Sequence, residues 1–182
     1  MRQRGLLLDR DGVINVDHGY VATRERFDFT PGVFPFLRAA QDCGYRLAIV
    51  TNQSGVARGL ATRHDYERLT AWMLEVLRGE GVTVGATLAC FEHDAGVDPA
   101  LCRASFWRKP NPGMILEAAL RLNLDLARSA LIGDQARDMQ AAQAAGVGTC
   151  LWLTEKDASP LSGITVVSCW SQILQALDTG SA

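Results

Sequence analysis

Two aspartates, Asp9 and Asp11, stand one residue apart directly behind three leucines in the segment LLLDRDGV. An ionised carboxylate in a dry protein interior carries a desolvation penalty of several kcal/mol unless a cation or hydrogen-bond donors offset it. The leucines indicate a buried strand, so both carboxylates would lie at the edge of a core. We therefore expect a positively charged partner where this strand ends.

Polar side chains also follow other strands that the sequence predicts. The second predicted strand ends in Thr51 and is followed by Asn52-Gln53-Ser54, and the fourth is followed by Asp134, with Asp138 four residues later. Arg108-Lys109 precedes a predicted helix. In open α/β sheets, ligands bind beyond the carboxyl ends of the strands. Carboxylates, a hydroxyl, amides and a lysine that converge there are suited to hold Mg²⁺ and a phosphate.

The elements that must position these residues alternate between short apolar runs and longer amphipathic stretches. This alternation predicts an α/β fold, Rossmann-like, with a mainly parallel sheet and helices on both faces. The predicted strands span residues 5–9, 46–51, 87–91, 130–133, 149–153 and 164–167. The predicted helices span residues 34–43, 62–78, 112–122 and 135–145, with cap, proline or glycine signals at their ends.

Composition limits the function classes. With 182 residues and 48% hydrophobic content, the chain suits one compact domain over residues 1–182. The formal net charge of −2 and the lack of a lysine or arginine run argue against a nucleic-acid partner. The basic start MRQRG is followed by only three leucines, too few for a signal-peptide core or a membrane span. We expect a cytoplasmic monomer with no membrane partner, whose five cysteines are reduced thiols.

Four short motifs, DRDGV, TNQSG, RKP and GDQARD, follow one another along the chain. In these motifs and their order, the chain resembles the haloacid dehalogenase (HAD) superfamily of phosphohydrolases over nearly its whole length. Within it, DRDGVINVDHGYV, TNQSGVARG and RKPNPGM resemble the heptose 1,7-bisphosphate 7-phosphatases and the related histidinol-phosphate phosphatases. Asp17-His18-Gly19-Tyr20 favours the heptose branch. The resemblance implies a magnesium-dependent enzyme that removes the 7-phosphate of a small sugar bisphosphate during synthesis of nucleotide-activated heptose for the lipopolysaccharide core.

The resemblance also implies a role for each motif residue. Asp9 matches the nucleophile that forms an aspartyl-phosphate, and Asp11 the acid and base that protonates the leaving oxygen and later activates water. Asp9, the backbone carbonyl of Asp11 and Asp134 would hold Mg²⁺, and Asp138 would orient its waters. The catalytic residues are expected to be Asp9, Asp11, Thr51 and Lys109. The expected substrate contacts are Arg10, Asp17, His18, Gly19, Tyr20, Thr51, Asn52, Gln53, Ser54, Arg58, Arg108 and Lys109. Arg108 would grip substrate hydroxyls or a second phosphate.

The spacing between motifs predicts how substrate reaches the site. About forty residues separate Asp11 from Thr51, and a loop plus one helix fill them, which leaves no room for an inserted cap domain. We therefore expect an essentially capless enzyme whose specificity comes from three rim loops, residues 17–26, 53–62 and 92–107.

Two features depart from the pattern of the heptose phosphatases. Relatives usually carry lysine after the aspartate of the last motif, where this chain has Gln135, which removes one positive charge near the phosphate. Relatives also bind zinc through C-x-H and C-x-C, and the aligned positions here are Cys90, Glu92, Ser105 and Trp107.

We expect no structural zinc, because a tetrahedral site needs four ligands and only Cys90 keeps its place. A substitute set of Cys90, His93 and Cys102 would need Glu92 or Asp94 to complete it. The loop is expected to be held instead by burial of four apolar residues, Phe91, Leu101, Phe106 and Trp107.

Other interpretations of the sequence remain open. A histidinol-phosphate phosphatase would share every catalytic residue and differ only at the rim. A non-catalytic phosphate-binding or receiver-like module would also show acidic strand ends and a lysine, but it would trap phosphate without turnover. Asp138 alone could be an ordinary helix cap, and His18 an ordinary surface residue. Three tryptophans in apolar patterns are most simply core residues: Trp72, Trp152 and Trp170.

Overall fold

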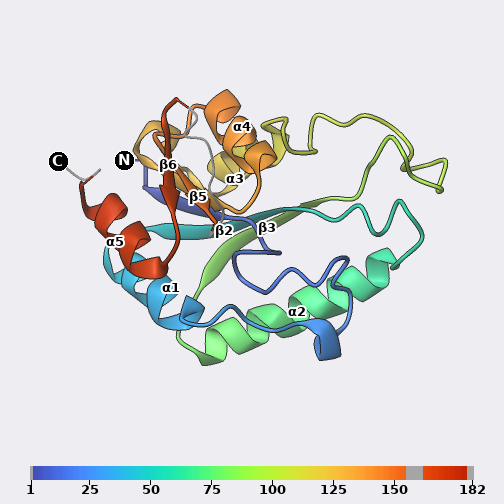
Figure 1. Ribbon diagram of the computed structural model, residues 1–182, viewed down its shortest axis with the longest axis horizontal. Helices are drawn as coiled ribbons and strands as arrows, with labels where there is room; N and C mark the ends of the chain where they lie inside the picture. The colour runs from blue at the N-terminus through green and yellow to red at the C-terminus, as the bar shows by residue number, and fades with distance from the viewer. Residues whose placement is uncertain (1, 155–161, 180–182) are drawn as a thin grey trace.

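The computed structural model describes residues 2–154 and 162–179. In this part of the chain six strands form one sheet in the order β3-β2-β1-β4-β5-β6, and every neighbouring pair is parallel (Figure 1). The strands are β1 (Gly5–Leu8), β2 (Arg46–Asn52), β3 (Val84–Cys90), β4 (Ala130–Gly133), β5 (Thr149–Leu153) and β6 (Ile164–Val167).

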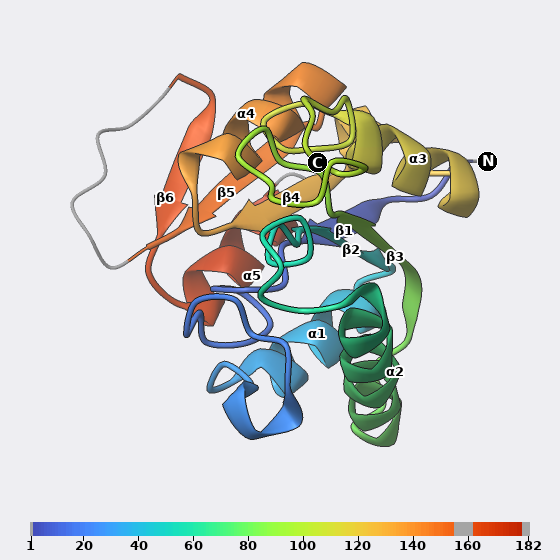
Figure 2. The ribbon, with the colours of Figure 1, turned by 90° about the vertical axis from the view of Figure 1, so that its right-hand side faces the viewer.

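Helices cover both faces of this sheet (Figure 2). One face carries α1 (Val33–Asp42), α2 (Arg63–Gly79) and α5 (Trp170–Thr179), and the other carries α3 (Gly113–Leu122) and α4 (Ala136–Ala145). Each group of helices encloses its own hydrophobic core against the sheet. The predicted α/β class, with a parallel sheet between two helical layers, is confirmed.

Strand β1 shows why the sheet needs both layers. Leu6 and Leu8 belong to the core under α1, α2 and α5, whereas Leu7 belongs to the core under α3 and α4. All three leucines are fully buried. Successive side chains of a strand point to opposite faces, so a strand that is apolar throughout requires cover on both sides.

The predicted elements are all present, with ends that differ by up to three residues. Strand β3 begins at Val84 rather than at residue 87. Helix α5 was not expected, although Trp170, Ile173 and Leu177 have helical spacing and pack into the core beside α1. The three tryptophans expected in the core are partly buried and pack against it rather than lying fully inside: Trp72, Trp152 and Trp170.

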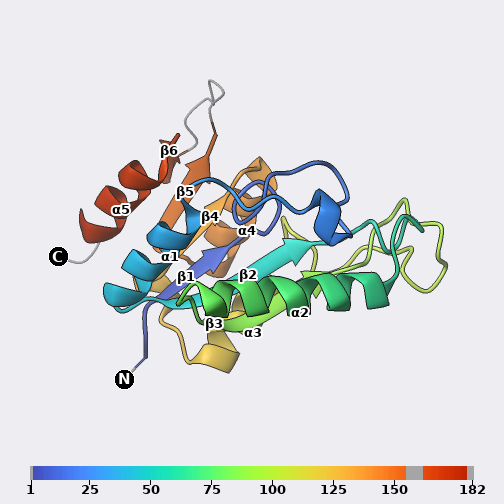
Figure 3. The same cartoon turned by 90° about the horizontal axis from the view of Figure 1, so that it is seen from below.

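The strand order places β1 beside β4 in the middle of the sheet. In a sheet of this order, the crevice that binds ligands lies at the carboxyl ends of the two central strands. Figure 3 shows the strands pointing towards the long loops, which gather at that end. Between β1 and β2 the chain forms only a short 3₁₀ helix (Arg24–Arg26) and α1, so no cap domain is inserted there. Among the described residues, no helix combines the length and the apolar character needed to cross a membrane.

Candidate active site

A buried ion-pair network lies at the carboxyl end of β1. Lys109 Nζ lies 2.8 Å from Asp9 Oδ2 and 2.7 Å from Asp138 Oδ1, and it donates a hydrogen bond to the Val50 carbonyl oxygen at 2.9 Å. Asp9, Lys109 and Asp138 are 6%, 1% and 0% exposed. Two carboxylate oxygens and one carbonyl oxygen thus surround the ammonium group and hold the lysine in place. Lys109 is a positively charged partner of the kind that the opening motif requires.

This network is short of positive charge. Burial raises the pKa of Asp9 from its ordinary value of 3.8 to about 7; Lys109 opposes the shift, and Asp138 and Asp134 add to it. Burial and the charge of Asp138 also raise the pKa of Asp134, although Gln135 opposes this. Burial would lower the pKa of Lys109, but Asp9 and Asp138 outweigh burial and raise it. One lysine therefore faces three carboxylates, and a further cation would be stabilised there.

Asp9, Asp134 and Asp138 offer that cation a site. One carboxylate oxygen from each lies within 4.8 Å of the others, and this is the one such group of histidine, cysteine, aspartate or glutamate within residues 2–154 and 162–179. A set of oxygen donors alone fits Mg²⁺, which is a hard cation and shares its coordination with phosphate.

Gly12 brings the first motif against the last. Its φ of +82° lies in the left-handed region, and a Cβ at this position would overlap the carboxyl group of Asp134. Both constraints favour glycine. The resulting turn places Gly12 against Asp134, and the carbonyl of the preceding residue, Asp11, is expected to complete the metal site.

The Asp11 carboxylate lies outside the acidic cluster and is oriented by three donors. Arg10 Nη2 donates to both of its oxygens at 2.8 Å, Asn15 Nδ2 to Oδ1 at 3.0 Å, and Gln53 Nε2 to Oδ2 at 2.8 Å. The side chain is 20% exposed and lines the pocket described below. A carboxylate held in this way beside the pocket is suited to exchange protons with a bound substrate.

Arg10, expected from the sequence to contact substrate, is buried beneath Asp11 and does not line the pocket described below. The side chain is 1% exposed, and Nη2 also donates to the Val21 carbonyl oxygen at 2.8 Å. Its guanidinium carbon lies 5.9 Å from the centre of the Phe27 ring. Arg10 therefore supports the Asp11 carboxylate from inside the protein.

Hydrogen bonds between Asn52 and Lys109 join the second motif to the third. Asn52 Nδ2 donates to the Lys109 carbonyl oxygen at 3.0 Å, and the Lys109 backbone N–H donates to Asn52 Oδ1 at 3.1 Å. Thr51 is 1% exposed, and its hydroxyl oxygen accepts a bond from Gln53 Nε2 at 2.9 Å. The end of β2 thus sets the position of the buried lysine.

A pocket of about 330 Å³ opens over these groups. Twelve of the expected site residues line it: Asp9, Asp11, Asp17, Gly19, Tyr20, Thr51, Asn52, Gln53, Ser54, Arg58, Arg108 and Asp134. Lys109 and Asp138 lie below, in contact with each other. His18 does not line this pocket, and its Nε2 lies 2.7 Å from Asp28 Oδ2 at the surface. Its substrate contact stays a prediction.

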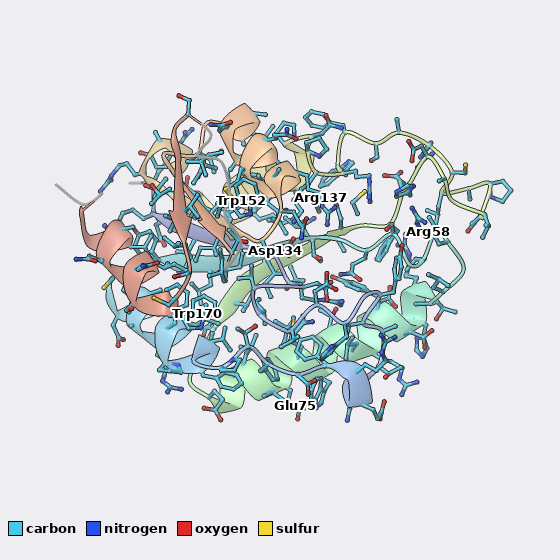
Figure 4. The ribbon with its side chains drawn as sticks, in the orientation of Figure 1. Arg58, Glu75, Asp134, Arg137, Trp152 and Trp170 are labelled. Carbon is cyan, nitrogen blue, oxygen red and sulfur yellow. The ribbon has the colours of Figure 1, made fainter. Side chains whose placement is uncertain are left out.

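Gly55, His93 and Arg137 also line the pocket and were not among the expected site residues. His93 was considered only as a zinc ligand. Arg137 lies in the first turn of α4, between Asp134 and Asp138 in the chain. Figure 4 shows Arg137 close to Asp134, with Arg58 further towards the loops. The position of Arg137 in the sequence predicts that it lies at the site, because the first turn of a helix that follows a central strand faces the ligand-binding edge of the sheet.

Polar contacts around Glu92 hold the loop between β3 and α3, residues 91–112. Arg103 pairs with the Glu92 carboxylate, Cys90 Sγ lies 3.7 Å from Glu92 Oε2, and Arg108 Nη1 donates to the Glu92 carbonyl oxygen at 3.4 Å. The expected apolar burial is wrong for two of the four residues, since Phe106 is 60% and Trp107 is 40% exposed.

The substitute zinc ligands do not gather in this loop. Cys90, His93 and Cys102 form no metal-binding group in the described chain. Cys102 is exposed, and its Sγ donates to the Asp94 carbonyl oxygen at 3.2 Å. The expectation that the protein lacks structural zinc stays a prediction.

Comparisons with known proteins agree with the geometry of the site. The HAD-hydrolase-like family model matches residues 106–163. The chain is 45% identical to D-glycero-α-D-manno-heptose-1,7-bisphosphate 7-phosphatase of Burkholderia mallei over 160 residues, 87% of this chain and 84% of the relative. The chain belongs to this phosphatase family.

Two further relatives support the assignment. The β-anomer 7-phosphatase of Vibrio cholerae is 47% identical over 152 residues, 82% of this chain and 80% of the relative. A solved structure of D,D-heptose 1,7-bisphosphate phosphatase from B. bronchiseptica, complexed with magnesium and phosphate, is similar with a TM-score of 0.80 and 29% identity. That similarity covers 94% of this chain and 98% of the solved one. The resemblance seen in the motifs is confirmed.

Proposed function

We propose that the protein is a magnesium-dependent phosphatase that removes the 7-phosphate of D-glycero-D-manno-heptose 1,7-bisphosphate. The observation that carries this proposal is the 45% identity to the Burkholderia mallei 7-phosphatase over 87% of the chain. The protein would act in the cytoplasm as a monomer on this small sugar bisphosphate.

Asp9 is the nucleophile in this proposal. Its carboxylate attacks phosphorus and forms an aspartyl-phosphate while the sugar oxygen leaves, so one difficult hydrolysis becomes two displacements. When bound by Asp9, Asp134 and the Asp11 carbonyl, Mg²⁺ supplies the positive charge that offsets repulsion between a carboxylate and a phosphate. The excess of carboxylates over lysine at this point supports such a site.

Asp11 is the acid and the base. It gives a proton to the sugar oxygen as the bond to phosphorus breaks, and the resulting carboxylate then takes a proton from the water that attacks the aspartyl-phosphate. Its place at the pocket, with donors that fix its orientation, supports both steps.

Three donors would hold the phosphoryl oxygens during transfer: the Thr51 hydroxyl, the Asn52 backbone N–H and the Lys109 ammonium. Fixed donors of this kind favour the transition state, in which charge spreads over those oxygens. Lys109 lies 2.8 Å from Asp9, so its charge acts where the phosphoryl group is received. Asp138 keeps Lys109 in place and would orient the waters of the metal.

Phosphate release from the α and β anomers of the heptose 1,7-bisphosphate, measured beside histidinol phosphate, tests the proposal. We expect one of the two anomers to show the highest kcat/KM, and phosphorus NMR to show that the 1-phosphate remains. Asp9→Asn is the matched control and should abolish release. Preference for histidinol phosphate would contradict the substrate assignment, and binding of phosphate without turnover would indicate a non-catalytic module.

A further inference from the structure

Three arginines from separate segments line the pocket above the catalytic residues. Arg58 comes from the loop after β2, Arg108 from the end of the loop after β3, and Arg137 from the first turn of α4, and all three line the pocket that contains Asp9. Figure 4 shows Arg137 near Asp134 and Arg58 towards the outer loops.

None of the three has a carboxylate partner within residues 2–154 and 162–179. Arg58 Nη2 lies 3.1 Å from His93 Nε2, while its Nε is buried without a hydrogen-bond partner. Arg108 reaches only a backbone carbonyl oxygen, that of Glu92. By contrast, Arg38, Arg103 and Arg121 each pair with a glutamate. The three pocket arginines therefore retain N–H donors that could bind an anionic ligand.

Their positive charges also repel one another. Burial lowers the pKa of Arg108, and the charges of Arg137 and Arg58 lower it further, although Cys90 and Asp94 oppose this shift. Arg137 stands in the first turn of a helix, where the helix dipole already favours an anion and disfavours a cation. A bound anion would relieve both costs, and a guanidinium is well shaped to hold phosphate oxygens in pairs.

Gln135, the residue beside Asp134, is uncharged and offers no positive charge to a bound anion. Gln135 Nε2 donates to Asp134 Oδ2 at 2.7 Å, so its amide is directed to the acidic cluster. Arg137, two residues later, is exposed to the pocket and carries the positive charge instead.

We propose that Arg137 is a specificity-determining residue that, with Arg58 and Arg108, binds a second phosphate of the substrate away from the phosphoryl group that Asp9 attacks. This inference rests on the proposed function. It predicts that the enzyme prefers bisphosphates to the matching monophosphates, and that Arg137 provides much of the preference.

The test is the ratio of kcat/KM for heptose 1,7-bisphosphate to kcat/KM for heptose 7-phosphate. We expect Arg137→Gln to lower this ratio roughly tenfold or more, mainly through a higher KM for the bisphosphate. Arg137→Lys should restore part of the ratio. Arg128→Gln is the matched control, because it removes an exposed arginine before β4, at the opposite end of the sheet, and should leave the ratio unchanged.

An unchanged ratio in Arg137→Gln, an equal loss in Arg128→Gln, or a wild-type enzyme without preference for the bisphosphate would overturn the inference. If neither heptose compound is hydrolysed, the proposed substrate fails, and the same ratio is measured with fructose 1,6-bisphosphate and fructose 6-phosphate. A fall in that ratio would support the arginine site without the heptose assignment, and no fall would overturn it.

Discussion

Asp9 and Asp11 lie one residue apart, yet the turn between them gives each a different environment. Asp9 is buried against Lys109, whereas Asp11 is partly exposed and is held by Arg10 and Gln53. Neighbouring carboxylates can carry different roles when their surroundings differ in this way. The pair thus fits one nucleophile and one proton donor.

The acid role of Asp11 predicts a dependence on the leaving group. Asp11→Asn should slow single-turnover phosphoryl transfer from the sugar phosphate by about 10²–10⁴-fold, because an alkoxide leaves poorly without a proton. Transfer from p-nitrophenyl phosphate should slow far less, because nitrophenolate needs no proton. Rapid-quench measurement of the released alcohol or phenol checks both. Equal losses for the two substrates would show that Asp11 acts in another way.

Side-chain direction limits how far single site residues can be predicted from the sequence. Asp9 and Asp134 follow strands, Thr51 lies near the end of one and Lys109 precedes a helix, so the order of the elements brings them together. Arg10 sits between two such residues, but only the folded turn directs it inwards. No pattern in the sequence predicts the contact between the Arg10 side chain and the Asp11 carboxylate.

At the scale of elements, the loop of residues 91–112 differs most from expectation. The sequence predicts that its aromatic residues Phe106 and Trp107 are buried, because apolar residues usually pack together. Both are exposed, and the loop is held instead by polar contacts to Glu92. Helix α5 shows the opposite case, since its apolar spacing was present in the sequence and its packing beside α1 follows from it. Periodic patterns predict elements well, and irregular loops depend on contacts that no period encodes.

The same loop predicts the zinc content of the protein. Protein purified without added zinc should contain well below one zinc per chain by metal analysis, because Cys90, His93 and Cys102 do not form a common site. Cys90→Ser is the control, since it should leave the zinc content unchanged. About one zinc per chain that disappears in this variant would show that the loop does bind the metal.

At the scale of the whole molecule, the stability of the fold should depend on the charge of the site. The pKa of Asp9 is raised to about 7 from 3.8, so the folded protein favours the protonated form. Stability of the metal-free protein should therefore fall as the pH rises from about 4 to about 7, and it should level off above pH 7. Mg²⁺ needs the ionised carboxylate, so its apparent affinity should weaken about tenfold for each pH unit below 7. Thermal unfolding at pH 6 and pH 8, in EDTA and in Mg²⁺, measures both effects.

Asp9→Asn separates this effect from other titrations. The variant keeps all three histidines and the other carboxylates but has no proton to exchange at residue 9. Its unfolding temperature in EDTA should change less between pH 6 and pH 8 than that of the wild type. Identical pH dependence in the two proteins would mean that burial of Asp9 is not coupled to stability.

The loop of residues 91–112 is tied to β2 at both of its ends. The Gln53 backbone N–H donates to the Cys90 carbonyl oxygen at 2.7 Å where the loop leaves the sheet, and Asn52 exchanges two bonds with Lys109 where it returns. The lysine thus stays in register with the strand whatever lies between the two anchors. Evolution can vary this loop, and an engineer can graft one from another phosphatase, to retune substrate choice without rebuilding the catalytic machinery.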